Sequence, residues 1–245
     1  MEAIKALSLG KIALGGKSVA LVAPNGSGKT SNCIAPAILY FLTCFPRGQV
    51  PVTSSSWIQV EKQLFPALRR YMDNPFFAGW TFNKTEIRTP EGGFAVGFST
   101  DNAGRAEGWH PKISPDVDPV FYVLDEAKTI PDSIFTAVSR CTLFNAFITS
   151  SPGADSGTFY DCFHKNSSLY YKIRVKYEDC PHIEINDPGK AERLKKEYGE
   201  QSSFYRSAIL GEFTDLDGQS VISRRAIMEP VSYTHLRAHE TVLDL

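Results

Sequence analysis

The fold of this chain is decided by Ser-Val-Ala-Leu-Val (residues 18–22) followed by Ala-Pro-Asn-Gly-Ser-Gly-Lys-Thr (residues 23–30). The first five residues are a nearly all-apolar run, which predicts a short buried strand. The next eight fit the phosphate-binding loop pattern, with alanine in place of its first glycine. The apolar stretch Thr30 to Phe45 predicts a buried helix. Strand, loop and helix in this order favour a phosphate-binding loop over an ordinary glycine-rich turn.

The residue types of the loop suit phosphate binding. Successive backbone N–H groups beside a helix N-terminus can surround phosphate oxygens, and the helix dipole favours their negative charge. Lys29 would reach the β- and γ-phosphates, and the Thr30 hydroxyl would bind Mg²⁺. With ATP and Mg²⁺ as the expected cofactors, the candidate binding residues are Ala23, Asn25, Gly26, Ser27, Gly28, Lys29 and Thr30.

The chain continues to alternate strands and helices. Gln49 to Thr53 predicts a second strand, and the serines at 54–56 are N-cap candidates for a helix from Trp57 to Met72. One stripe of that helix is apolar, and its other face carries Glu61, Lys62, Arg69 and Arg70.

The middle of the chain predicts a sheet that is mainly parallel. Short β-prone pieces between Trp80 and Phe98 suit a hairpin, and 99–118 predicts a loop. The uninterrupted apolar run Val120 to Leu124 is typical of a strand buried on both faces. A helix over 131–141 and a strand over 146–149 follow. We therefore expect an α/β fold with helices flanking a mainly parallel sheet, and ligands at the carboxyl ends of its strands.

A carboxylate pair follows the buried strand. We expect this strand to neighbour the loop strand, so that Asp125 would hold the metal and Glu126 would polarise the attacking water. The alternative is an acidic pair that caps a helix. Glu126 favours hydrolysis over nucleotide sensing alone.

Composition narrows the class of protein. In 245 residues, 26 Lys and Arg nearly balance 27 Asp and Glu, which argues against a polybasic nucleic-acid binder. Five cysteines without a C-x-x-C pair suit a reducing compartment. The N-terminus lacks a continuous apolar signal region, and the longest apolar stretch is too short to cross a bilayer, so we expect neither export nor membrane anchoring.

From residue 166 onward, the sequence pattern no longer shows the regular alternation of strands and helices. One strand is predicted over 169–177 and one or two helices over 188–210. Cysteine and histidine occur in two Cys-x-His pairs, Cys162 with His164 and Cys180 with His182. Their spacing differs from that of zinc sites, so a chance arrangement is favoured over a metal site. Asp215 and Asp217 favour a turn over a metal pair. A basic group suits either DNA phosphate or a solvated strand face, namely Lys165, Lys172, Arg174 and Lys176.

Four segments together resemble the ATPase half of a tailed-bacteriophage terminase large subunit. They are the phosphate-binding loop, Gly97 to His110, Val120 to Glu126, and Thr149 to Pro152. The resemblance implies a P-loop NTPase core of the RecA/ASCE type. It also implies a motor that couples ATP hydrolysis to translocation of double-stranded DNA into procapsids in the host cytoplasm. The implied partners are a homo-oligomeric ring, the terminase small subunit and the portal protein.

The resemblance also implies roles for single residues. Lys29 and Thr30 match the phosphate and Mg²⁺ contacts, and Thr149 and Ser150 match a motif that couples the γ-phosphate to subdomain motion. Arg105 matches an arginine that reaches a neighbouring subunit's γ-phosphate; a solvated loop arginine is the alternative. His110 is expected to order the same loop.

We expect an ATPase core over 1–165, a small lid or linker subdomain over 166–220, and the start of a linker to an absent nuclease domain over 221–232. Residues 233–245 match no family pattern and suggest a non-native tail. The resemblance implies a glutamine that reads adenine upstream of the phosphate-binding loop, but no glutamine precedes Gln49. The residues that read adenine are therefore not assigned. The alternatives are a helicase-like ATPase, a regulatory GTPase and a ring subunit that does not hydrolyse ATP.

Overall fold

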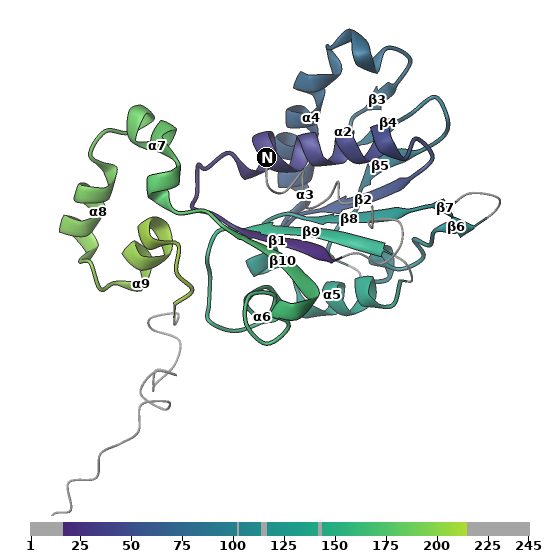
Figure 1. Ribbon diagram of the computed structural model, residues 1–245. Helices are drawn as coiled ribbons and strands as arrows, with labels where there is room; N and C mark the ends of the chain where they lie inside the picture. Colours follow the sequence, from purple (N-terminus) through teal and green to yellow (C-terminus); the bar gives the residue numbers. More distant parts are fainter. Residues whose placement is uncertain (1–16, 102, 114–116, 142–143, 215–245) are drawn as a thin grey trace, which may run out of the picture.

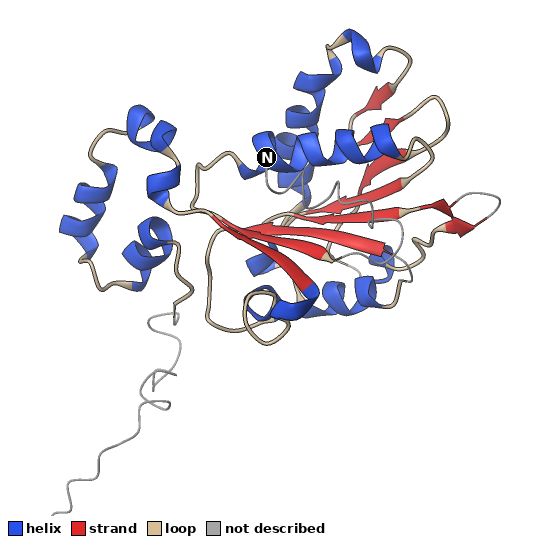
Figure 2. Ribbon diagram, viewed as in Figure 1, coloured by secondary structure: helices blue, strands red, loops and turns tan. Residues whose placement is uncertain are grey.

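The computed structural model describes residues 17–101, 103–113, 117–141 and 144–214, and it has an eight-stranded sheet with helices on both faces (Figures 1 and 2). The strand order is β10-β1-β9-β8-β2-β5-β4-β3. The strands are β1 (Ser18–Val22), β2 (Gln49–Thr53), β3 (Thr81–Asn83), β4 (Glu86–Arg88), β5 (Phe94–Gly97), β8 (Val120–Leu124), β9 (Phe144–Ser150) and β10 (Tyr170–Arg174).

The sheet is mainly parallel. From β10 through β1, β9, β8 and β2 to β5 every pair of neighbours is parallel, whereas β4 is antiparallel to both β5 and β3. The expected α/β fold is confirmed, and the expected hairpin is β4–β5. A second, two-stranded sheet, β6 (Lys112–Ile113) with β7 (Val117–Asp118), lies in the stretch that we expected to be only a loop.

The order of the central strands corrects one expectation. We expected β8, which ends at the carboxylate pair, to lie directly beside β1, but β9 lies between them. Phe147 of β9 pairs with Val19 of β1 on one side and with Val123 of β8 on the other. All three side chains are fully buried, so β9 is as suited to the centre of the sheet as its neighbours. The polar end of β9 therefore lies between the loop and the carboxylates.

Helices cover each face of the sheet, as Figure 1 shows. One face packs against α2 (Ala35–Cys44), α3 (Trp57–Gln59) and α4 (Phe65–Met72), and the other against α5 (Asp132–Ser139) and α6 (Thr158–Asp161). Each face of the sheet has its own hydrophobic core, and strand β1 contributes side chains to both. Val19 and Leu21 belong to the core under α2 and α4, and Ala20 and Val22 belong to the core on the α5 side.

Each of the two helices expected over 30–45 and 57–72 contains a π-helical segment. Lys29–Ile34 precedes α2, and Val60–Leu64 precedes α4. A proline, Pro36 or Pro66, occupies the second position of each following α-helix. Proline has no N–H to donate to the carbonyl four residues earlier, which allows the wider turns before it. The irregularity next to the phosphate-binding loop thus has a cause in the sequence.

The C-terminal segment contributes to the main sheet before it leaves it. Strand β10 is shorter than predicted and pairs with β1 in parallel, and α7 (Pro181–Asn186), α8 (Lys190–Tyr198) and α9 (Ser203–Tyr205) lie beyond the ends of the strands (Figure 1). The division of the chain at residue 166 stays a prediction. Asp215, Asp217 and the expectations for 221–232 and 233–245 fall outside the described residues. Across the described ranges, we find no helix that is both long and apolar enough to traverse a bilayer.

Candidate functional site

The phosphate-binding loop connects β1 to the π-helical segment that begins at Lys29. Gly26 and Gly28 adopt left-handed backbone conformations, with φ of 81° and 79°. A side chain at position 28 would place Cβ 2.5 Å from Nδ2 of Asn32, whereas position 26 has nothing within 4 Å. Both glycines are needed for the conformation of the loop, and a side chain at position 28 would also displace the exposed side chain of Asn32.

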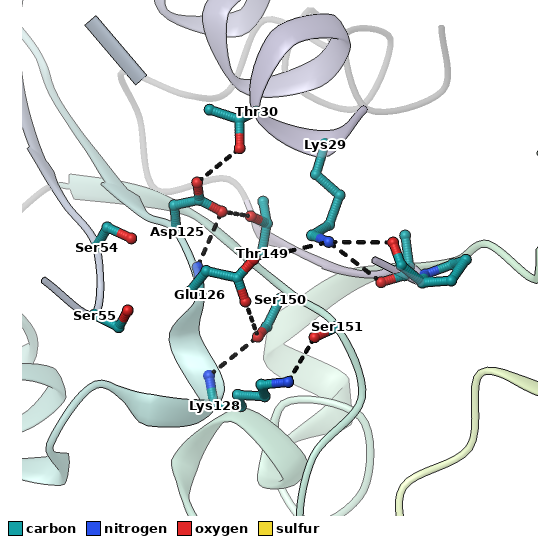
Figure 3. A network of polar contacts seen from close by, with 12 residues as sticks. Lys29, Thr30, Ser54, Ser55, Asp125, Glu126, Lys128, Thr149, Ser150 and Ser151 are labelled. Carbon is teal, nitrogen blue, oxygen red and sulfur yellow. Dashed lines mark hydrogen bonds and ion pairs between the residues drawn. The ribbon is translucent and has the colours of Figure 1, made fainter. Parts of the chain in front are cut away.

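The side chain of Lys29 folds back over its own loop. Its Nζ donates to the carbonyl oxygens of Ala23 at 3.4 Å and Pro24 at 3.3 Å, and it lies 3.9 Å from Oε1 of Glu126 (Figure 3). Only 6 % of the lysine is exposed. A nearly buried ammonium group held by weak acceptors is available to a stronger one, such as a phosphate oxygen.

Asp125 is oriented by three donors. Its Oδ2 accepts a hydrogen bond from Oγ1 of Thr30 at 2.9 Å, and its Oδ1 accepts from Oγ1 of Thr149 at 2.8 Å and from the backbone N–H of Glu126 at 2.9 Å. Burial raises the pKa of Asp125, and the charge of Glu126 adds to this increase, while the hydrogen bonds from Thr149 and Thr30 oppose it. A cation bound beside this carboxylate would favour its ionised form.

Glu126 is held in a rare backbone conformation. It has φ of 50° and ψ of 43°, and it is the only described residue other than glycine with a positive φ. Its Oε2 accepts a hydrogen bond from Oγ of Ser150 at 3.3 Å. The left-handed conformation costs about 1–2 kcal/mol for a residue with a Cβ atom. Backbone strain of this size is often found at functional sites, which makes Glu126 a candidate functional group.

The end of strand β9 connects the carboxylates to Lys128, which follows Glu126 closely in the sequence. Ser150 accepts a hydrogen bond from the backbone N–H of Lys128 at 3.3 Å, and Nζ of Lys128 donates to Oγ of Ser151 at 2.6 Å. Burial lowers the pKa of Lys128. Figure 3 shows these contacts as one continuous set with Asp125 and Glu126. The structure therefore brings Thr149 and Ser150 into the site; their coupling role stays a prediction.

The residues present suit a nucleoside triphosphate with Mg²⁺. The hydroxyl of Thr30 and the carboxylate of Asp125 are hard oxygen donors that already lie together. Ser27 in the loop has a buried Oγ without a hydrogen-bond partner among the residues that the structure describes. A phosphate oxygen is an acceptor for such a hydroxyl. The loop, Thr30 and Glu126 all line one cavity of about 440 Å³.

The opposite wall of this cavity was not predicted from the sequence. It consists of Lys62, Gln63, Pro66, Ala67 and Arg70. We expected Lys62 and Arg70 on the face of their helix opposite the apolar stripe. The signal that could have placed them is topological, because a helix that follows a parallel strand begins at the carboxyl edge of the sheet, where the loop also lies.

Arg105 lies elsewhere. It makes an ion pair with Asp101 at 3.1 Å and lines a separate cavity with Trp57 and Trp109. The structure therefore does not bring Arg105 to the cavity that the phosphate-binding loop lines in the same chain. That Arg105 reaches the γ-phosphate of a neighbouring subunit stays a prediction. The backbone carbonyl of His110 accepts from the side-chain amide of Gln49 at 3.0 Å, a contact that helps to order the loop.

The four Cys and His side chains of the C-terminal part do not converge. Sγ of Cys162 donates to the carbonyl of Thr158 at 3.2 Å, His164 stacks on Tyr160, and Nε2 of His182 lies 3.0 Å from the carbonyl oxygen of Gly26. Among the residues that the structure describes, no group of three or more possible metal ligands was found. The contact of His182 nevertheless joins α7 to the phosphate-binding loop.

The basic group around β10 is only partly free for a ligand. The guanidinium of Arg174 lies 4.8 Å from the ring centroid of Phe163 and 5.7 Å from that of Phe213. Lys176 forms an ion pair with Glu178 at 3.3 Å. Binding of DNA by this group stays a prediction.

Comparison with known proteins identifies the fold. No family model and no curated protein sequence matches the chain. The large terminase of a thermophilic bacteriophage superposes with a TM-score of 0.63 at 11 % identity over 87 % of this chain and 52 % of that one. The Thermus phage P74-26 large terminase ATPase domain superposes with 0.58 at 17 % identity over 83 % of this chain and 93 % of that one. The fold is that of a large-terminase ATPase domain.

The terminase likeness includes a structure with bound nucleotide. The large terminase of the thermophilic bacteriophage, in complex with ATP-γ-S, matches with a TM-score of 0.58 at 14 % identity, over 87 % of this chain. The chain spans about half the length of that terminase, 52 %, and most of the P74-26 ATPase domain. The α/β fold with a mainly parallel sheet that the sequence implied is thus confirmed.

Proposed function

We propose that this chain is the ATPase motor domain of a DNA-packaging terminase and hydrolyses Mg-ATP at the carboxyl edge of its sheet. One observation carries the proposal: Lys29, Thr30 and Glu126, from two separate segments, line a single cavity, and a hydrogen bond joins Thr30 to Asp125 directly behind it. This set combines phosphate binding, metal binding and a carboxylate base, which together suffice for triphosphate hydrolysis.

The residues divide the work according to their contacts. The loop N–H groups and Lys29 bind the β- and γ-phosphates, and Lys29 leaves its carbonyl partners to do so. Thr30 and Asp125 hold Mg²⁺, which when bound neutralises phosphate charge. Glu126 accepts a proton from the attacking water, and Ser150 fixes the direction of its carboxylate.

The packaging role rests on family resemblance. The fold matches proteins described as large terminases, one from a thermophilic bacteriophage and one from Thermus phage P74-26. By that likeness we assign double-stranded DNA as the translocated substrate and the host cytoplasm as the site of action. A homo-oligomeric ring, the terminase small subunit and the portal protein are the assigned partners.

Phosphate release with and without duplex DNA tests the proposal. We expect Mg²⁺-dependent release that duplex DNA increases, and a loss of at least about 100-fold in Lys29→Ala, because a lysine on the transferred phosphate supplies several kcal/mol. Lys196→Ala, which removes an exposed lysine of α8, is the matched control and should behave as the unmodified chain. Activity that Lys29→Ala leaves unchanged contradicts the proposal, and a strong preference for GTP favours the GTPase alternative.

A further inference from the structure

Helix α4 forms a fixed wall opposite the phosphate-binding loop. Phe65 and Leu68 of this helix are fully buried in the core that also holds α2. The hydroxyl of Tyr71 donates a hydrogen bond at 2.8 Å to the carbonyl of Ser31, which lies just after the loop. Because α4 is anchored both to the core and to the start of the loop's helix, the residues on its cavity side keep a defined position relative to the loop.

The basic side chains around the cavity differ in how far their charge is already neutralised. Lys29 lies close to Glu126. Lys62 forms an ion pair with Glu61 at 3.0 Å, and hydrogen bonds from Lys84 and Lys62 lower the pKa of that glutamate. Arg70 makes no ion pair with any residue that the structure describes. Arg70 therefore contributes a guanidinium charge to the cavity that no described carboxylate offsets.

The neighbouring arginine provides an internal comparison. The guanidinium of Arg69 lies 4.3 Å from the ring centroid of Phe82, and Arg69 does not line the phosphate cavity. The two arginines are consecutive on one helix and are both exposed, yet only Arg70 is directed to the cavity. Arg69 and Arg70 therefore have the same charge and size and belong to the same helix, but they have different surroundings.

We propose that Arg70 binds the terminal phosphate of the triphosphate within its own chain and so makes the site favour triphosphate over diphosphate. This inference rests on the proposed function, because it takes the shared cavity as the nucleotide site. Arg70 lines that cavity together with Thr30 and Glu126, which the proposed function assigns to Mg²⁺ and to the water that attacks the γ-phosphate. A guanidinium can donate two parallel hydrogen bonds to phosphate oxygens, which a lysine cannot do. The contact requires no neighbouring subunit, in contrast to the role predicted for Arg105.

Nucleotide binding by the whole chain tests this assignment. We measure the dissociation constants of ATP-γ-S and ADP, each with Mg²⁺, by calorimetry. In Arg70→Gln we expect ATP-γ-S to bind about tenfold more weakly, which corresponds to about 1.4 kcal/mol. ADP binding should stay within about twofold, and it also reports that the variant is folded. Arg69→Gln is the matched control and should leave both constants unchanged. Arg70→Lys should recover part of the loss, because it restores the charge without the paired donors.

The outcomes separate this inference from the proposed function. If the unmodified chain binds both nucleotides and Lys29→Ala abolishes binding, but Arg70→Gln leaves the ratio of the two constants unchanged, the assignment of Arg70 is overturned and the proposed function stands. Equal weakening of both nucleotides in Arg70→Gln also overturns it. If the unmodified chain binds neither nucleotide, both proposals are overturned.

Discussion

The hydroxyl of Thr149 is the donor whose removal gives the clearest measurable effect. Thr149 is fully buried, and its Oγ1 donates at 2.8 Å to Oδ1 of Asp125, which is only 5 % exposed. Valine has nearly the same shape as threonine but cannot donate. Thr149→Val therefore deprives a buried carboxylate of one of its three donors without leaving a cavity.

A hydrogen bond to a charged, buried group contributes about 1.5–3 kcal/mol, and the added methyl group of valine recovers less than about 1 kcal/mol. We expect Thr149→Val to lower the free energy of unfolding by about 2 kcal/mol, which for a chain of this size lowers the melting temperature by about 4–8 °C. Thermal unfolding followed by circular dichroism measures this shift. The same variant should turn ATP over more slowly, because Asp125 is less well oriented.

Thr136→Val is the matched control for this measurement. Its hydroxyl also donates a hydrogen bond, to the carbonyl of Asp132 at 3.0 Å, but it lies on the exposed side of α5. We expect its melting temperature to change by no more than about 2 °C, as for surface substitutions of about 0.5 kcal/mol. Equal melting temperatures for Thr149→Val and Thr136→Val would refute the reasoning that Asp125 depends on the buried donor.

Two further predictions concern backbone conformation at the site. Gly26→Ala and Gly28→Ala should each lower the free energy of unfolding by about 1–2 kcal/mol, because both positions have a positive φ and the exposed side chain of Asn32 can move away from a Cβ at position 28. Unfolding midpoints in urea that equal that of the unmodified chain would contradict this account. Glu126→Gly should raise the free energy of unfolding by about 1 kcal/mol, since glycine relieves the φ of 50°, while hydrolysis is lost. A variant that is less stable, or that keeps its turnover, contradicts the strain argument.

Local sequence pattern was sufficient for the elements that carry the chemistry. The strands 18–22, 49–53 and 120–124 have the predicted bounds, because each is a short apolar run followed by a turn or polar residues. The loop and the carboxylate pair follow two of these strands directly. Their convergence was expected because the carboxyl ends of parallel strands share one edge of a sheet.

What was missed depends on contacts between distant segments. The position of β9 between β1 and β8, and the entry of β10 into the sheet, are set by strand pairing that no local pattern records. The position of Arg70 on the cavity wall also depends on the arrangement of distant segments. In the sequence, a charged residue opposite an apolar stripe looks the same whether it faces a cavity or solvent. The π-helical segments were not predicted, because Pro36 and Pro66 are equally compatible with the first turn of an ordinary α-helix.

The central claim is that the residues around this cavity hydrolyse ATP, and Glu126→Gln tests it most directly. The substitution keeps the size of the side chain and removes the carboxylate that accepts the proton of the attacking water. We predict that Glu126→Gln binds ATP-γ-S within about twofold of the unmodified chain and releases phosphate from ATP at least about 100-fold more slowly. Phosphate release at the unmodified rate by a variant that still binds the nucleotide would contradict the account.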